Sequence, residues 1–240
     1  MKNMQDERIS LFIKDLNDCL KPNYEIVKSI FNNEYGFPAL DPLRDEICKC
    51  FMCGLYQSTI TLTNHLLERS LKFCLASKYT FETKEKESDI RTVFKEGIDK
   101  YDNSMLEQTI NAACTQGIIT KDQKKELKAF RDKFRNPYSH AFNNIFEGKK
   151  VKGKVISSAD LENGIDNFFK HCFDKTTDEE FDLENLPFAQ GIMQIKIAKE
   201  DSLPYFKRVD EIIRDMLNKI VSQENNQPTT HRILHSLPQA

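Results

Sequence analysis

The residues best suited to chemistry lie in one short stretch, AFRDKFRNPYSHAF, which covers residues 129–142. Arg135 is followed directly by Asn136, and His140 comes five residues after the arginine. Histidine titrates near neutral pH and can accept or donate a proton. Arginine stays charged, and its planar set of donors matches the oxygens of a phosphate.

These residue types suit the cleavage of RNA by attack of the neighbouring 2′-hydroxyl on the phosphodiester. One group must accept the hydroxyl proton, a donor must protonate the leaving oxygen, and positive charge must stabilise the crowded phosphate. Asn136 could orient His140 or bind the phosphate. We therefore predict Arg135, His140 and Asn136 as catalytic residues, in a reaction that needs no metal and no cofactor.

Pro137 lies between the arginine and the histidine and affects how they are placed. On one straight helix, residues five apart diverge by about 140°, so the two side chains would not share a target. Proline has no N–H and disfavours helical angles at the residue before it. The sequence predicts a break or kink at Arg135–Asn136, with Pro137 opening the next turn and both side chains facing one cleft.

A local excess of positive charge surrounds this motif. Residues 121–155 contain eleven lysines and arginines and four acids, a balance of +7, which leaves −9 for the rest of a chain whose total is −2. Charge runs often form only a solvated helix face, but this excess would also attract a phosphate-bearing ligand. The predicted RNA-binding residues are Arg131, Lys133, Lys149, Lys150, Lys152 and Lys154.

A cysteine cluster and a histidine are the other groups that could bind a ligand. On a helix, Cys48 and Cys50 of the CKCFMC segment would point to nearly opposite sides, and the sequence has no second CxxC motif. The odd total of seven cysteines favours reduced, buried thiols over a disulfide framework. We interpret the cysteines as core residues, and His65 as a core or interface residue.

Apolar residues recur at helical spacing along almost the whole chain, which predicts an all-α helical bundle. Asp41 before a proline, Thr120 with Gln123, and Gly117 are typical of helix ends. We expect residues 80–102 to be partly loop and residues 147–158 to form a loop or small hairpin. Residues 41–79 are expected to form a long helical hairpin or a bent helix, loosened near Gly54. The other expected helices cover 9–20 with an end near Pro22, 23–32, 105–114, 121–134, 158–173, 187–199 and 203–222.

The expected organisation is an N-terminal helical extension over 1–40, a helical domain over 41–222 and a disordered tail over 223–240. No run approaches the roughly 20 apolar residues that cross a bilayer, and the polar start lacks the features of a secretory signal. We therefore expect no membrane contact and a cytoplasmic location.

The segment RNPYSH, residues 135–140, resembles the Arg-x4–6-His motif of the HEPN superfamily (higher eukaryote and prokaryote nucleotide-binding), in which asparagine often follows the arginine. The upstream segment GLYQSTITLTNHLLERSLKFCL, with an acid at Glu68, is similar to the paired helix of that family. The resemblance covers about residues 41–220. It implies a HEPN-like bundle of four or five helices that forms a homodimer and brings two Arg/His motifs to a shared cleft.

The same resemblance implies a metal-independent endoribonuclease of a toxin–antitoxin or antiviral defence system, with RNA as substrate and an antitoxin or defence-system protein as partner. In one toxin subgroup, a partner nucleotidyltransferase modifies a tyrosine two residues after the histidine. Phe142 stands at that place, so this mode of silencing is excluded. Two other interpretations remain open: a non-catalytic HEPN bundle that binds nucleotide, RNA or protein, and a helical scaffold in which Arg135 only caps a helix.

Overall fold

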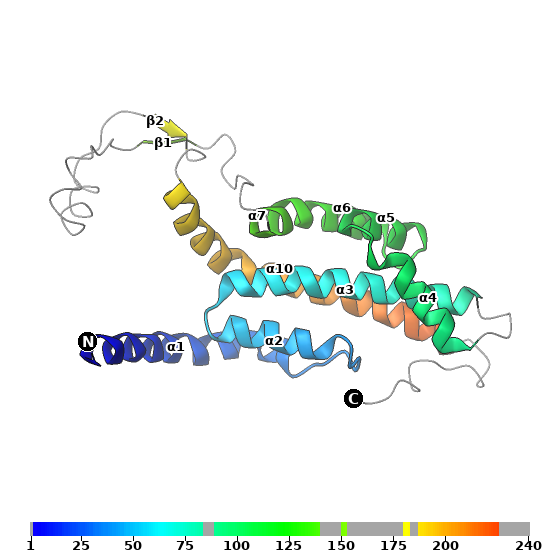
Figure 1. Cartoon of the computed structure of the whole chain (residues 1–240), viewed down its shortest axis with the longest axis horizontal. Coiled ribbons are helices and arrows are strands. Elements are labelled where there is room, and N and C mark those ends of the chain that lie inside the picture. Colours follow the sequence, from blue (N-terminus) through cyan, green and yellow to red (C-terminus); the bar gives the residue numbers. More distant parts are fainter. Residues whose placement is uncertain (1, 84–88, 140–149, 153–179, 183–186, 226–240) are drawn as a thin grey trace. The chain divides into compact units, whose positions relative to one another are not determined.

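The computed structural model describes residues 2–83, 89–139, 150–152, 180–182 and 187–225, and Figure 1 draws these parts as ribbons. The all-α prediction is confirmed, since the described strands contain only three residues each. The elements are α1 (Lys2–Phe31), α2 (Asp41–Met52), α3 (Tyr56–Thr83), α4 (Ile90–Asp102), α5 (Leu106–Thr115), α6 (Lys121–Phe130), the π-helix η1 (Arg131–Arg135), α7 (Asn136–Ser139), β1 (Lys150–Lys152), β2 (Glu180–Asp182) and α10 (Pro187–Asn225).

The chain divides into two compact units, one formed by residues 1–141 with 197–240 and the other by residues 142–196. In the second unit, β1 and β2 pair antiparallel, with Val151 opposite Phe181. A loop or local hairpin was predicted around β1. A strand does form there, but its partner β2 lies far beyond the predicted segment. The predicted helix over 158–173 and residues 226–240 of the predicted tail lie outside the described residues.

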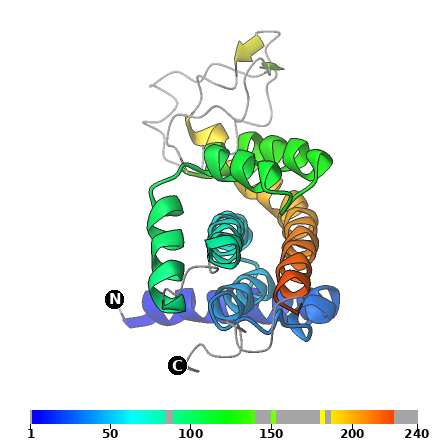
Figure 2. The ribbon, with the colours of Figure 1, turned by 90° about the vertical axis from the view of Figure 1, so that its right-hand side faces the viewer.

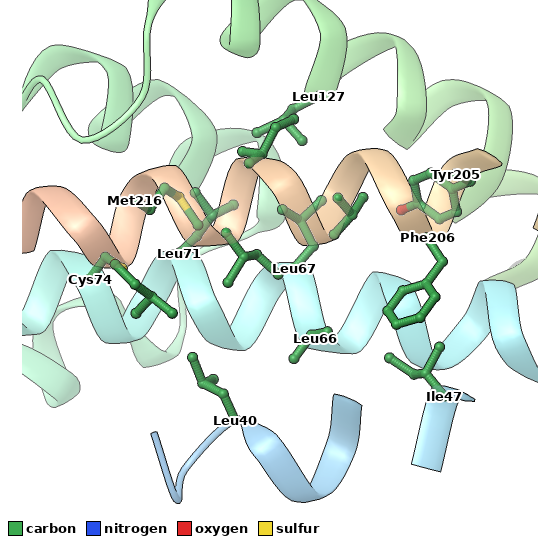
Figure 3. Close-up of a cluster of buried hydrophobic side chains, with 14 of the residues drawn as sticks. Leu40, Ile47, Leu66, Leu67, Leu71, Cys74, Leu127, Tyr205, Phe206 and Met216 are labelled. Carbon is green, nitrogen blue, oxygen red and sulfur yellow. The ribbon is translucent and has the colours of Figure 1, made fainter. Parts of the chain in front are cut away.

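Helix α3 lies at the centre of the first unit, with α2, α4, α5 and α10 around it (Figure 2). The predicted apolar stripe on this helix is confirmed, because Ile60, Leu67, Leu71, Cys74 and Leu75 are all buried. Figure 3 shows Leu67 and Leu71 between α3 and α10, near Met216 and opposite the side of α3 that faces α2. Burial of this stripe on several neighbours provides the main stabilisation of the unit.

The β-branched segment STITLT, which conflicts locally with a helix, is helical because its hydroxyl groups find partners. The hydroxyl of Thr63 donates to the carbonyl of Thr59 at 2.6 Å, and that of Thr59 donates to Leu55 at 3.0 Å. Both threonines are fully buried. A buried hydroxyl that bonds the preceding turn satisfies its polar group without leaving the helix.

Several predicted helix ends are confirmed. Gly54 has φ +75° between α2 and α3, and Gly117 has φ +71° after α5, a conformation that glycine adopts without strain. Thr120 and Gln123 form the predicted capping box. Asp41 is not an N-cap, because Leu40 occupies that position. Instead, the Asp41 carboxylate accepts the N–H groups of the preceding turn, at 2.8 and 2.7 Å.

Two predicted interruptions are wrong. Helix α1 continues through Pro22, and α10 continues through residues 200–202, where a gap between two helices was predicted. An internal proline removes one backbone hydrogen bond and favours a kink, but it does not have to end a helix. Residues 80–102 were predicted to be partly loop. In this segment α3 reaches Thr83 and α4 begins after Asp89, whose carboxylate accepts from the N–H of Arg91, and residues 84–88 lie outside the described residues.

Candidate functional site

The segment that carries Arg135 continues α6 as the π-helix η1. The N–H of Asn136 donates to the carbonyl of Arg131, five residues earlier, and Asn136 has helical angles of φ −64° and ψ −50°. A break or a kink was predicted at Arg135–Asn136. The break is therefore wrong, and the kink stays a prediction. Pro137 has no N–H to donate to the preceding turn, and the wider π turn ends just before it. Such widened turns occur frequently at functional sites.

A cluster of four side chains, the buried Phe134, Tyr205 and Asn64 and the half-buried Phe130, fixes this segment on α3 and α10. The ring of Phe134 stacks on Tyr205 with centroids 4.2 Å apart, and Phe130 meets Tyr205 edge-on at 5.1 Å. The Tyr205 hydroxyl donates to Asn64 Oδ1 at 2.7 Å, and Asn64 Nδ2 donates to the carbonyl of Phe134 at 3.4 Å. We call this set the Tyr205 cluster.

The cluster holds the residue before Arg135 by both its ring and its carbonyl group. Asn64, Tyr205 and Phe134 are 6%, 2% and 3% exposed, so these contacts are made away from water. Burial raises the pKa of the Tyr205 hydroxyl, which keeps this group protonated as a hydrogen-bond donor. Because polar groups in such a place are costly without partners, the cluster favours one placement of η1.

Two of the predicted catalytic residues, Arg135 and Asn136, lie just beyond the Tyr205 cluster. Arg135 and Asn136 are partly exposed, and Asn136 Nδ2 donates to Asp132 Oδ1 at 3.4 Å. Burial, with a smaller effect of the Asp201 carboxylate, raises the pKa of Tyr138 to about 12. His140 lies outside the described residues. The structure thus places two of the three predicted catalytic residues, side by side at the junction of η1 and α7.

The predicted RNA-binding residues on η1 already contact acids. Arg131 pairs with Glu107 at 2.5 Å and with Asp132 at 2.8 Å. Lys133 pairs with Asp201 at 2.8 Å, and its ammonium lies 4.9 Å from the ring centre of Phe134. These two side chains help to fix η1, and part of their charge is offset by their partners. Of the other predicted residues, Lys150 and Lys152 lie in β1, and Lys149 and Lys154 lie outside the described residues.

A groove of about 980 Å³ is a second candidate site, formed where the start of α2 meets α3 and α4. Its lining includes the apolar side chains of Leu62, Phe73 and Phe94 and the polar side chains of His65 and Arg69. His65 was predicted as a core or interface residue. The core alternative is wrong, because this side chain is exposed at the groove, and the interface alternative stays a prediction. The groove can therefore offer an apolar surface beside a cation and a titratable imidazole.

The cysteine cluster separates into a core residue and two surface residues. Cys48 is fully buried, whereas Cys50 and Cys53 are partly exposed. Burial raises the pKa of the Cys48 thiol to about 12, which suits an unreactive core residue. In the described part of the chain, no three His, Cys, Asp or Glu side chains are grouped as a metal site. Within the same ranges, no helix is long and apolar enough to cross a membrane.

The chain was compared with protein-family models, with curated proteins and with solved structures. None of the three comparisons found a match.

Proposed function

We propose that this protein is a metal-independent endoribonuclease of the HEPN type, which acts as a toxin or antiviral-defence effector in the form of a homodimer. One observation carries the proposal: Arg135, five residues before a histidine, is the last residue of a π turn that the Tyr205 cluster fixes on two other helices, and Asn136 follows it directly. A catalytic arginine needs such a fixed backbone, because transition-state stabilisation depends on donors that are already in place.

The proposed reaction assigns one task to each group. The Arg135 guanidinium binds the non-bridging phosphate oxygens and stabilises the charge that develops on them. His140 transfers the proton, either from the attacking 2′-hydroxyl or to the leaving 5′-oxygen, and its counterpart in the partner copy takes the other step. Asn136 orients the histidine or the phosphate. The nucleophile belongs to the RNA, so the reaction requires no metal-bound water.

The test uses purified protein and a labelled single-stranded RNA, with and without EDTA. We expect cleavage in both conditions and products that end in a 2′,3′-cyclic phosphate and a 5′-hydroxyl. Arg135→Ala and His140→Ala should each abolish cleavage, and the double variant should be scarcely worse than either one, since the residues act as a unit. His65→Ala is the matched histidine control and should cleave like wild type. Cleavage that requires added Mg²⁺, or an active His140→Ala variant, would refute the assignment.

The α3–α4 groove favours a second candidate function, a non-catalytic bundle that binds a nucleotide, RNA or a protein partner. Its apolar lining and the neighbouring Arg69 could hold a ligand without any reaction. In that case, the chain would bind RNA or nucleotide without cutting RNA. His65→Ala and Arg69→Ala would then weaken binding, whereas Arg135→Ala would not.

A further inference from the structure

The first half of α1 carries an apolar stripe that faces water. Ile9, Phe12, Ile13 and Leu20 are 58%, 63%, 50% and 42% exposed, and Leu16 lies between them on the same face. Their spacing of three, four and seven residues places all five side chains on one face of a helix. Single exposed apolar residues need no explanation, but a contiguous row of them is typical of an interaction surface.

The stripe continues a face that the same helix buries farther along. Positions 9 and 16 are followed at the same seven-residue interval by Asn23 and Ile30, which are 8% and 9% exposed. Asn23 Nδ2 donates to the carbonyl of Phe51 at 2.9 Å, so α2 covers this half of the face. In Figure 1, the earlier half of α1 extends beyond the end of α2.

A contact along the exposed half of α1 would also stabilise this part of the helix. Helices in proteins depend mainly on packing of their apolar face for stability. Pro22 removes one of the backbone hydrogen bonds that join this half to the packed half. A contact along the stripe would supply the missing packing.

Two exposed charges at one edge of the stripe identify the partner. Arg8 and Asp15 are seven residues apart, so they lie on the same side of the apolar row. When two copies of the helix pack antiparallel about a two-fold axis, this edge of one helix meets the same edge of the other. Arg8 of each copy then approaches Asp15 of the other, which gives two equivalent ion pairs. A parallel pair would instead set this edge against the opposite edge, where Ile13 and Leu20 lie.

We propose that the stripe of Ile9, Phe12, Ile13, Leu16 and Leu20 is a docking surface for a second copy of this chain, in an antiparallel α1–α1 pair with reciprocal Arg8–Asp15 contacts. This interface lies on a different element from the shared Arg135/His140 cleft at which the ribonuclease dimer would form. The inference therefore does not rest on the proposed function. If both contacts form, the α1 contact joins two ribonuclease dimers.

The first test removes the apolar contact in the full-length chain. Light scattering after size-exclusion chromatography should show that Ile9→Glu with Ile13→Glu halves the mass of the wild-type species at micromolar concentration. Leu11→Glu is the matched control: Leu11 is 60% exposed but lies about 150° around the helix from the stripe. We expect this variant to keep the wild-type mass. Equal masses for wild type and the double variant would overturn the proposal and leave the stripe to another partner.

The second test determines whether the two α1 helices pack antiparallel. It uses charge variants and so does not depend on whether the Ile9→Glu, Ile13→Glu variant folds. Arg8→Asp alone and Asp15→Arg alone each place like charges opposite one another, so each should raise the dissociation constant of the pair several-fold at low salt. The double variant exchanges the two charges and should restore the wild-type value. If the single variants associate as wild type does, or the double variant fails to recover, the antiparallel pair is refuted.

Discussion

In the proposed ribonuclease, Tyr205 lies behind the active site and acts only by positioning η1. Tyr205→Phe keeps the ring that stacks on Phe134 but removes the hydroxyl that donates to Asn64 Oδ1 at 2.7 Å. The buried amide of Asn64 then has an unsatisfied oxygen. Its orientation is less restricted, which weakens the hydrogen bond from Asn64 Nδ2 to the carbonyl of Phe134. Leaving a buried acceptor without its donor costs about 1–3 kcal/mol of unfolding free energy.

The effect on cleavage should exceed what this loss of stability explains. A displacement of about 1 Å can reduce a rate about 100-fold, and Arg135 follows Phe134 directly in the chain. We expect kcat to fall between about 10- and 100-fold while KM changes little, because Tyr205 itself does not touch the RNA. Single-turnover cleavage at saturating protein, measured well below the melting temperature, gives this rate.

Tyr101→Phe is the matched control for the loss of a buried tyrosine hydroxyl. Tyr101 is 7% exposed and its hydroxyl accepts from Gln116 Nε2 at 2.8 Å, but it lies on α4 and contacts no residue of the Tyr205 cluster through a described hydrogen bond. This variant should lose a similar amount of stability and cleave at the wild-type rate. Equal rates for the two variants, whether both reduced or both normal, would refute the positioning role of Tyr205.

Three further outcomes test the fold. Asp210→Asn should cost about 3–5 kcal/mol in urea unfolding, because Arg44, 1% exposed and 2.8 Å from the Asp210 carboxylate, would keep its charge without a buried partner; a loss below about 1 kcal/mol would contradict this reading. Gly97→Ala should lower the melting temperature despite the better helix propensity of alanine, since the new Cβ would lie 3.0 Å from a backbone oxygen of α3. Burial raises the pKa of the Cys48 and Cys74 thiols from 9.0 to about 12, so the folded state favours their protonated forms. Their contribution to stability should be complete below pH 9 and should be lost between pH 9 and 12, with a falling urea midpoint; a constant midpoint from pH 8 to 10.5 would contradict it.

The sequence predicted the fold where packing and local signals agree and failed where they compete. The helical spacing of apolar residues in α3 and the capping box of α6 could both be predicted, because in these helices the local signals agree with the packing. Pro22 was predicted to end a helix, since a proline in a helix costs about 3 kcal/mol or more, and a gap between two helices was predicted over residues 200–202, just before Pro204. The buried side chains that follow Pro204, Tyr205 and Phe206, outweigh that cost, but their contacts come from distant parts of the chain.

The same difference separates the predictable part of the candidate site from the rest. Arg135 and Asn136 could be found by residue type and spacing, whereas the bond from Tyr205 to Asn64 spans 141 residues and has no local signature. One signal was nevertheless present. Relative to Ile60, Leu67 and Leu71, Asn64 lies within about 40° of the centre of the apolar stripe, and His65 lies about 140° away. A polar residue inside the stripe is expected to be buried with a partner, so the helical angle would have assigned Asn64 to the core. For residues outside the stripe the angle does not decide, because α3 is covered on several sides: Thr59, about 100° from the centre, is fully buried, whereas His65 is exposed.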